Sequence, residues 1–450
     1  MKLKQAFSFI LNPNKRGEEV LELLAKQNTD QSFWANAKKQ FKKNRIAVFS
    51  FKIIVFLIFI AIFSDFLANE KPIVANYQDK IYFPIFKSYA VDLGLSEWPS
   101  NFQNVEWKNL NYNWVVFPPI PYLPKNLDAN NIHSVSPFAE QNIKSLLWRH
   151  WLGTDELGHD ILAAMIHGTR IALLVGLVSM SIASIIGILL GAMAGYFGDE
   201  RLKMSRGRLI LNCLFFSLAL FYGFGSRSYI LAEALSVSFS SFFLEFFISL
   251  LLMGALLGIG NLLVIPLKWI PYFSKKVKIP VDIVVSRMIE IMLSIPTLFL
   301  IISIAAIAKP SLFLVMAIIG MTSWTGIARF IRAELLKVRS LEYIEAAHAL
   351  GYSEARTLFR HAIPNALSPV LIAIAFGIAS AILIESTLSF LSIGVPPETL
   401  TWGALLSAAR QSPTAWWLAI FPGLAIFITV TIYNLVGEGL TDALDPRLKK

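Results

Sequence analysis

The chain has 450 residues, of which 55% are hydrophobic and only 16% are charged. Soluble proteins carry roughly 25% charged residues, and the apolar residues here form long uninterrupted blocks. The composition therefore excludes an ordinary set of soluble domains and indicates an integral membrane protein. The net charge of +10 does not require a nucleic-acid partner, since membrane proteins concentrate Lys and Arg in cytoplasmic segments. The single cysteine, Cys213, excludes an internal disulfide.

Long apolar stretches recur along the chain. A membrane-spanning helix needs about 20 apolar residues, because the hydrocarbon core offers the backbone no hydrogen-bond partners. Eight stretches meet or approach this length, namely 47–67, 171–197, 209–225, 242–267, 288–308, 311–331, 369–391 and 416–437. They predict an all-α integral membrane protein with about eight spans, of which the short stretch 209–225 is the weakest.

The distribution of charge predicts the orientation. Residues 1–45 hold ten Lys or Arg and four acids, whereas residues 68–168 hold seven and ten. Because cytoplasmic segments are enriched in Lys and Arg, we expect a cytoplasmic segment (1–46), an uncleaved first helix (47–67), a small extracytoplasmic segment and a transmembrane domain (169–450). Eight crossings place the later basic connections and both termini in the cytoplasm.

The connection between the sixth and seventh stretches, residues 332–366, is polar and overlaps the segment LEYIEAAHALGYSEARTLFRHAIPNALSPV (341–370). It predicts two short helices. Gly351 is expected to end the first in a left-handed conformation, and Ser353 to cap the second. Pro364 is expected to stop that second helix. The result is a rigid elbow facing the cytoplasm.

This elbow resembles the cytoplasmic coupling loop of permeases of binding-protein-dependent ABC importers. The family pattern is Glu-Ala-Ala, three residues, Gly, and then a hydrophobic residue and Pro about a dozen residues on. The matching positions are Glu345, Ala346, Ala347, Gly351, Ile363 and Pro364, with Ile where Leu is usual. The resemblance implies that the elbow fits a groove on an ATP-hydrolysing subunit and transmits its closure to the membrane helices.

Other blocks narrow the resemblance. Residues 150–176, 385–406 and 437–448 look like the second permease subunit of dipeptide and oligopeptide importers, and residues 68–89 are similar to the microcin C and oligopeptide subgroup. Such a subunit forms half of a translocation path with a related permease chain in the cell's inner membrane. The cargo stays open among dipeptides, longer peptides, microcin-like compounds and nickel complexes.

Two features depart from the family. His159 stands where Arg is usual, which leaves any ion pair at this position in doubt. Residues 203–280 are inserted where the family has a short cytoplasmic connection. Without its two apolar stretches a six-helix core remains, the usual number for this family. An insert that crosses the membrane twice preserves the orientation of everything after it, and we expect a hairpin packed against lipid.

The resemblance also implies the partners. They are the second permease subunit, two ATPase subunits that hold ATP and Mg, an extracytoplasmic peptide-binding protein and membrane lipid. The chain itself contains no GxxxxGK[ST] phosphate loop. We therefore expect a non-catalytic subunit without a cofactor of its own.

Acids in apolar surroundings are candidate functional residues, since burial at membrane depth costs at least about 2.5 kcal/mol. Glu385, in AILIESTLSF, is a candidate for facing a lumen or bridging helices, and a buried hydrogen bond to a neighbouring Ser or Thr is the alternative. Glu290 is expected to pair with Arg287, and Glu245 to reach the external interface.

Two other functions remain possible from the sequence. A self-sufficient secondary transporter or channel should show acids at mid-membrane and internal inverted repeats; one candidate acid and no obvious repeat are present. An intramembrane hydrolase or metal site could use Asp155, Glu156, His159 and Asp160. We expect these acids instead to favour the positive end of the helix that begins the second crossing, because no HExxH motif accompanies them.

Overall fold

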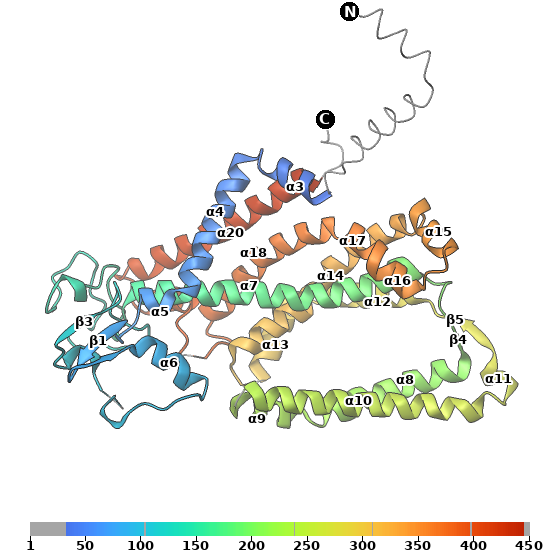
Figure 1. The fold of residues 1–450 in the computed structure, drawn as a ribbon, viewed down its shortest axis with the longest axis horizontal. Helices are drawn as coiled ribbons and strands as arrows, with labels where there is room; N and C mark the ends of the chain where they lie inside the picture. The colour runs from blue at the N-terminus through green and yellow to red at the C-terminus, as the bar shows by residue number, and fades with distance from the viewer. Residues whose placement is uncertain (1–32, 103–104, 238, 308, 397, 445–450) are drawn as a thin grey trace, which may run out of the picture. The chain divides into compact units, whose positions relative to one another are not determined.

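The computed structural model describes residues 33–102, 105–237, 239–307, 309–396 and 398–444 (Figure 1). Most of the predicted basic segment 1–46 and the predicted cytoplasmic end 445–450 lie outside the described residues. The chain forms two compact units. Among the described residues, the first contains 33–188, 295–330 and 365–444, and the second contains Leu189–Ser294 and Ile331–Pro364.

Within the described residues, seven helices are long and apolar enough to cross a membrane, or eight if one broken pair counts as a span. The seven are α4 (Arg45–Ile62), α7 with η4 (Ile161–Ala192 and Met193–Phe197), α8 with η5 (Arg206–Leu220 and Phe221–Gly225), α10 (Phe239–Leu267), α14 (Leu312–Val338), α18 (Ser368–Phe390) and α20 (Trp417–Leu444). The broken pair is α12 (Val281–Ser294) and α13 (Thr297–Ile307), with Pro296 in the break. Each predicted stretch overlaps one of these in order, which confirms the all-α prediction of about eight spans.

Several helices extend beyond the apolar stretches that predict them. The helix α7 begins at Ile161 instead of residue 171, and α14 continues to Val338 instead of residue 331. Conversely, α4 ends at Ile62, and the short helix α5 (Ser64–Leu67) follows. The apolar stretch predicts only the part of a helix that lies in the hydrocarbon. The helix itself continues, through its backbone hydrogen bonds, until a capping residue or a helix-breaking residue ends it. The predicted boundaries at 168 and 332 therefore fall inside helices.

The segment between α4 and α7 contains a small antiparallel sheet of order β2-β1-β3, which the all-α prediction does not include. Its strands are β1 (Val74–Tyr77), β2 (Lys80–Tyr82) and β3 (Trp114–Val116). Gln78 and Asp79, between β1 and β2, have φ of 52° and 57°, as a tight hairpin of type I′ requires. The segment also contains α6 (Pro84–Asp92), η1 (Ser100–Phe102), η2 (Trp107–Asn109) and η3 (Leu146–Trp148).

Polar contacts fasten this segment to α7. The Arg170 guanidinium lies 2.6 Å from Asp65 Oδ2 and donates to the carbonyl oxygen of Ala61 at 2.8 Å. One turn earlier, His167 Nε2 lies 2.9 Å from the carbonyl oxygen of Ala68. These contacts satisfy backbone carbonyls where α4 and α5 end, so the chain leaves α4 along a fixed path.

Close helix packing forms the rest of the first unit. The helix α20 packs against α3 (Phe33–Phe41), α4, α18 and α19 (Trp402–Gln411) (Figure 1). A side chain at Gly439 of α20 would place its Cβ 2.2 Å from the Cβ of Ala47 in α4. Only glycine therefore fits at this position. Burial from water cannot drive helices together inside a membrane, so close van der Waals contact of this kind holds them together instead.

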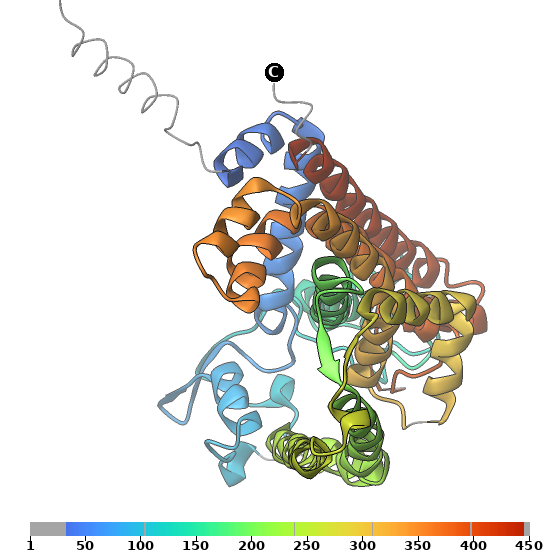
Figure 2. The same ribbon diagram turned by 90° about the vertical axis from the view of Figure 1, so that its right-hand side faces the viewer.

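The insert forms a hairpin in the second unit. The helices α8 and α10 lie side by side in both views (Figures 1 and 2), and Gly260 of α10 lets Phe215 of α8 approach closely. The strands β4 (Lys203–Ser205) and β5 (Lys276–Lys278) pair with each other. Their pairing closes the insert at its base, and these strands lie at the boundaries predicted from sequence. The connecting helices are α9 (Ser228–Val237) and α11 (Pro271–Ser274).

The acids of this second unit have local partners. Glu245 forms an ion pair with Arg227, which also donates to Ser249 Oγ at 3.1 Å. The expectation that Glu245 only reaches toward an interface is therefore incomplete, since its partner comes from the connection between α8 and α10. Glu290 pairs with Arg287, as predicted.

Candidate functional site

The first helix of the predicted elbow is α15 (Glu342–Ala349). It ends at Gly351, whose φ is +78°. The Gly351 N–H donates to the carbonyl oxygen of His348 at 2.9 Å, and the Tyr352 N–H donates to that of Ala347 at 3.1 Å. This pair of bonds defines a Schellman motif, in which glycine takes the left-handed position without steric cost. The predicted cap is confirmed.

The second helix begins where the sequence predicts. Ser353 Oγ accepts a hydrogen bond from the backbone N–H of Arg356 and caps α16 (Glu354–Thr357). The helix then widens into the π-turn η6 (Leu358–Ala362) and continues as α17 (Ile363–Ala366). The prediction that Pro364 stops this helix is wrong. Pro364 lies directly after this π-turn, and the helical run continues past it to Ala366.

The residues that match the coupling pattern divide between the surface and the interior. Glu345, Ala346, Gly351 and Pro364 are exposed, whereas Ala347 and Ile363 are buried. We use "elbow" for residues 341–364, which belong to the second unit. The exposed apolar side chains of the elbow are Leu341, Tyr343, Leu350 and Phe359, and Leu350 is 73% exposed. Apolar side chains beside a carboxylate on a rigid surface suit docking of another protein.

Glu385 is almost completely buried in α18. Ser389 Oγ donates to its carboxyl at 2.6 Å and Ser386 Oγ at 3.4 Å, both from the same helix. The side chain of Thr401, which caps α19, also hydrogen bonds to the carboxyl. The predicted local hydrogen bonds are thus present, and the Thr401 contact joins α18 to the beginning of α19. The role of Glu385 in a lumen stays a prediction.

Substituting Glu385 tests these two roles. We expect Glu385→Ala to lower the free energy of unfolding by about 1–3 kcal/mol, because it leaves buried hydroxyl groups unpaired. Glu385→Gln should recover most of this loss, since its amide can replace the carboxyl oxygens as a hydrogen-bond partner. Thermal unfolding of the purified protein measures both. A Gln variant that is stable but inactive in transport would instead assign a function to the charge.

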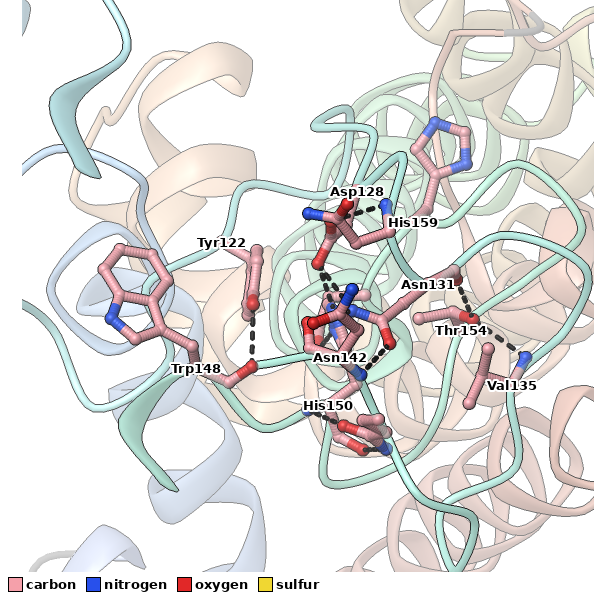
Figure 3. A network of polar contacts seen from close by, with 12 residues as sticks. Tyr122, Asp128, Asn131, Val135, Asn142, Trp148, His150, Thr154 and His159 are labelled. Atoms are coloured by element: carbon pink, nitrogen blue, oxygen red, sulfur yellow. Dashed lines mark hydrogen bonds and ion pairs between the residues drawn. The ribbon is translucent and has the colours of Figure 1, made fainter. Parts of the chain in front are cut away.

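Sequence reasoning missed His150, a fully buried polar group in the segment between α4 and α7 (Figure 3). His150 Nδ1 lies 2.8 Å from Asp160 Oδ2, and its Nε2 lies 3.1 Å from Asp128 Oδ2. The Tyr122 ring stacks on the imidazole at a centroid distance of 4.3 Å. Because both ring nitrogens face carboxylates, both must donate, and the imidazole is charged. No spacing signal could identify this group, since Asp128 lies 22 residues from His150.

The environment shifts the pKa values of His150 and Asp128 in opposite directions, and both shifts favour the charged form. Burial alone lowers the pKa of His150, but hydrogen bonds and charge from Asp160 and Asp128 outweigh it and hold the pKa above its usual value. Burial alone raises the pKa of Asp128, but hydrogen bonds from Asn131, His150 and the Asn130 N–H hold it below its usual range. Each charge is therefore stabilised by the other.

The acids near α7 have structural roles. Asp160 Oδ1 accepts a hydrogen bond from the Ala163 N–H at 2.6 Å and so caps the beginning of α7, whereas Asp155 and Glu156, predicted to lie in the first turn of this helix, lie before it. His159 Nδ1 lies 2.7 Å from Asp155 Oδ2, so the residue that departs from the family pattern still contacts a carboxyl group. In the part of the chain that the structure describes, no group of three or more His, Cys, Asp or Glu side chains is placed to hold a metal.

Comparison with known proteins agrees with this architecture. The family model described as "binding-protein-dependent transport system inner membrane component" matches residues 269–450, which include the elbow. A second, described as "N-terminal TM domain of oligopeptide transport permease C", matches residues 32–84, which include α4. Most of the insert lies outside both matches.

Relatives extend the similarity over most of the chain. The peptidoglycan transport system permease protein YejE of Agrobacterium fabrum is 27% identical over 442 residues, 93% of each chain. The inner membrane ABC transporter permease protein YejE of Escherichia coli is 28% identical over 93% of this chain and 97% of that protein. The di/tripeptide transport system permease protein DppC of Pseudomonas aeruginosa is 30% identical over 67% of this chain and 73% of that protein. The chain belongs to the binding-protein-dependent permease family.

This permease is thus the membrane component of an ABC transport system, and the resemblance drawn from its motifs is confirmed. Its membership follows from the relative of 30% identity, which matches 67% of this chain and 73% of that protein.

Proposed function

We propose that this permease imports peptides and is driven by ATPase subunits that dock on the elbow. The observation that carries the proposal is the elbow itself, a rigid pair of capped helices with Glu345, Leu350 and Phe359 exposed. Its residues follow the coupling pattern of a family whose members depend on other subunits for energy. The relatives named for peptidoglycan, dipeptide and tripeptide transport favour peptide cargo.

The proposal assigns a place to each partner. A second permease chain completes the translocation path, and two ATPase subunits bind ATP and Mg on the cytoplasmic side, where the elbow and both termini lie. An external binding protein delivers peptide to the segment 68–160. ATP binding favours one of two arrangements of the helix bundle. A ligand can shift such an equilibrium only if its contacts differ between the two arrangements, and the elbow is where the ATPase subunits make these different contacts. This chain takes no part in covalent chemistry and binds no nucleotide.

Reconstitution tests the proposal. The permease, its partner chain, the ATPase subunits and the binding protein are assembled in liposomes, and peptide uptake is measured with and without ATP. We expect uptake that requires ATP and every subunit. Uptake by this chain alone, driven by an ion gradient, would establish a secondary transporter instead.

The class of cargo has its own measurement. Ligands extracted from the copurified binding protein and identified by mass spectrometry should be peptides. A nickel complex or another small solute in the binding protein would still support an importer but would contradict peptide as its cargo.

A further inference from the structure

A tyrosine at the end of α7 contacts both helices of the elbow. Tyr196 is fully buried, and its hydroxyl oxygen lies 3.2 Å from Nε2 of His348 in α15. The hydroxyl also hydrogen bonds to Glu354, the first residue of α16. His348 Nε2 and Glu354 Oε2 are themselves 3.9 Å apart. One hydroxyl group therefore lies where the two elbow helices meet.

The backbone around Tyr196 is shaped for this contact. Tyr196 belongs to the π-turn η4, and such turns add a residue to the helical turn and redirect the side chains. Beside it, a Cβ on Gly195 would lie 2.6 Å from the carbonyl oxygen of Arg332 in α14. Arg339 donates to the Gly195 carbonyl oxygen at 3.4 Å. The π-turn is thus in direct backbone contact with the cytoplasmic end of α14, where the elbow begins.

The residues that follow Tyr196 extend the contact to α12 and the insert. Asp199 Oδ1 accepts a hydrogen bond from the Ile283 N–H at 3.1 Å, at the beginning of α12. Glu200 pairs with Lys278 of β5 at 2.8 Å. In addition, Arg332 of α14 forms a bidentate ion pair with Asp282 of α12, and Arg332 Nη2 lies 2.7 Å from Asp282 Oδ2. Residues 195–200 therefore contact the elbow, α12, α14 and the base of the insert.

We propose that Tyr196 is the positioning residue that fixes the two elbow helices to the π-turn of α7, so that the elbow moves together with the ends of α7, α12 and α14. The inference rests on the proposed function, in which the ATPase subunits act on the elbow. The buried ring of Tyr196 fixes the position of its hydroxyl, and the hydroxyl fixes the angle between α15 and α16. Without this bond, the elbow can rotate on its own, and part of its movement is lost before it reaches the membrane helices.

The test uses Tyr196→Phe, which removes the hydroxyl and keeps the ring over which Arg201 lies. The whole complex is reconstituted, and peptide uptake and ATP hydrolysis are measured in the same vesicles. We expect the amount of assembled complex to be unchanged and the peptide taken up per ATP to fall about fivefold, the effect of one lost buried hydrogen bond. A merely structural role would reduce the amount of complex and leave this ratio at its wild-type value, which would overturn the inference.

Tyr272→Phe is the matched control. Tyr272 lies in α11 of the insert, outside the elbow, where Arg206 lies over its ring as Arg201 lies over that of Tyr196, and the substitution keeps the ring. The ratio of uptake to hydrolysis should stay at the wild-type value. An equal fall in this control would overturn the specific role of the Tyr196 hydroxyl.

His348→Ala, which removes the imidazole, tests the contact from the elbow. It should lower the ratio by a similar factor, and the double variant with Tyr196→Phe should be no worse than either single variant, because both remove the same contact. Full additivity of the two losses would overturn the inference.

Glu345→Lys, measured in parallel, separates the two proposals. If Glu345→Lys does not uncouple transport from ATP hydrolysis, the proposed function is overturned. If Glu345→Lys uncouples transport and Tyr196→Phe does not, only the role of Tyr196 is overturned.

Discussion

Glu345→Lys is expected to reduce ATP-dependent uptake at least about thirtyfold while the permease still inserts and folds. Glu345 is exposed in α15 and has no part in the packing of the elbow. If the elbow occupies a groove on an ATPase subunit, the substitution places a cation where the groove fits an anion. Loss of such a charge contact costs about 2–5 kcal/mol, and each 1.4 kcal/mol corresponds to about tenfold in affinity. Uptake and copurification of the ATPase subunits measure the effect.

Glu342→Lys provides a closely matched control. Glu342 is exposed, lies one turn earlier in the same helix and undergoes the same charge reversal beside the same helix end. Both substitutions therefore lose a similar favourable interaction with the helix dipole, about 0.3–1 kcal/mol. Only Glu345 belongs to the coupling pattern, so its variant should be much the more severe. Equal and wild-type uptake in both variants, with ATPase subunits still bound, would remove the elbow from the mechanism.

His150→Ala is expected to destabilise the segment between α4 and α7 by about 3–5 kcal/mol. The substitution removes the buried cation and leaves the carboxylates of Asp128 and Asp160 facing each other without compensation, which is the costly way to break a buried ion pair. Limited proteolysis and thermal unfolding of the purified permease report the change. The control is His133→Ala, since His133 pairs with Glu156 at the surface, and exposed pairs contribute little.

The same group predicts a dependence of stability on pH. Because the pKa of His150 is raised in the folded chain, its contribution is complete below the unfolded value of about 6.5 and is lost as the pH rises through the folded value. The pKa of Asp128 is lowered, so its contribution is lost as the pH falls through that lowered value. Protease resistance of the wild type should therefore decline at alkaline pH. The difference in protease resistance between the wild type and His150→Ala should shrink as the pH rises. A difference that stays constant would contradict the role of a charged His150 in stability.

Much of the membrane architecture follows from the sequence, because burial in hydrocarbon imposes one strong and local requirement. Each apolar stretch long enough to span the bilayer corresponds to a helix, and the break at Pro296 lies where proline removes a backbone donor. The caps of the elbow are equally local. Gly351 supplies a left-handed residue and Ser353 a side-chain acceptor, and both act within a few residues of their own position.

The sequence thus determined the number and order of the spans, the hairpin in the insert and the two-helix elbow with its exposed Glu345. The tertiary structure alone decided which distant polar side chains meet. Asp128 and His150 meet in the segment between α4 and α7, and Tyr196 meets His348 across 152 positions of the chain. The π-turn that directs Tyr196 has no sequence signature, since apolar periodicity does not register one extra residue in a turn. A pattern along the chain reports the solvent around each residue, whereas an ion pair or a buried hydrogen bond depends on how separate helices pack.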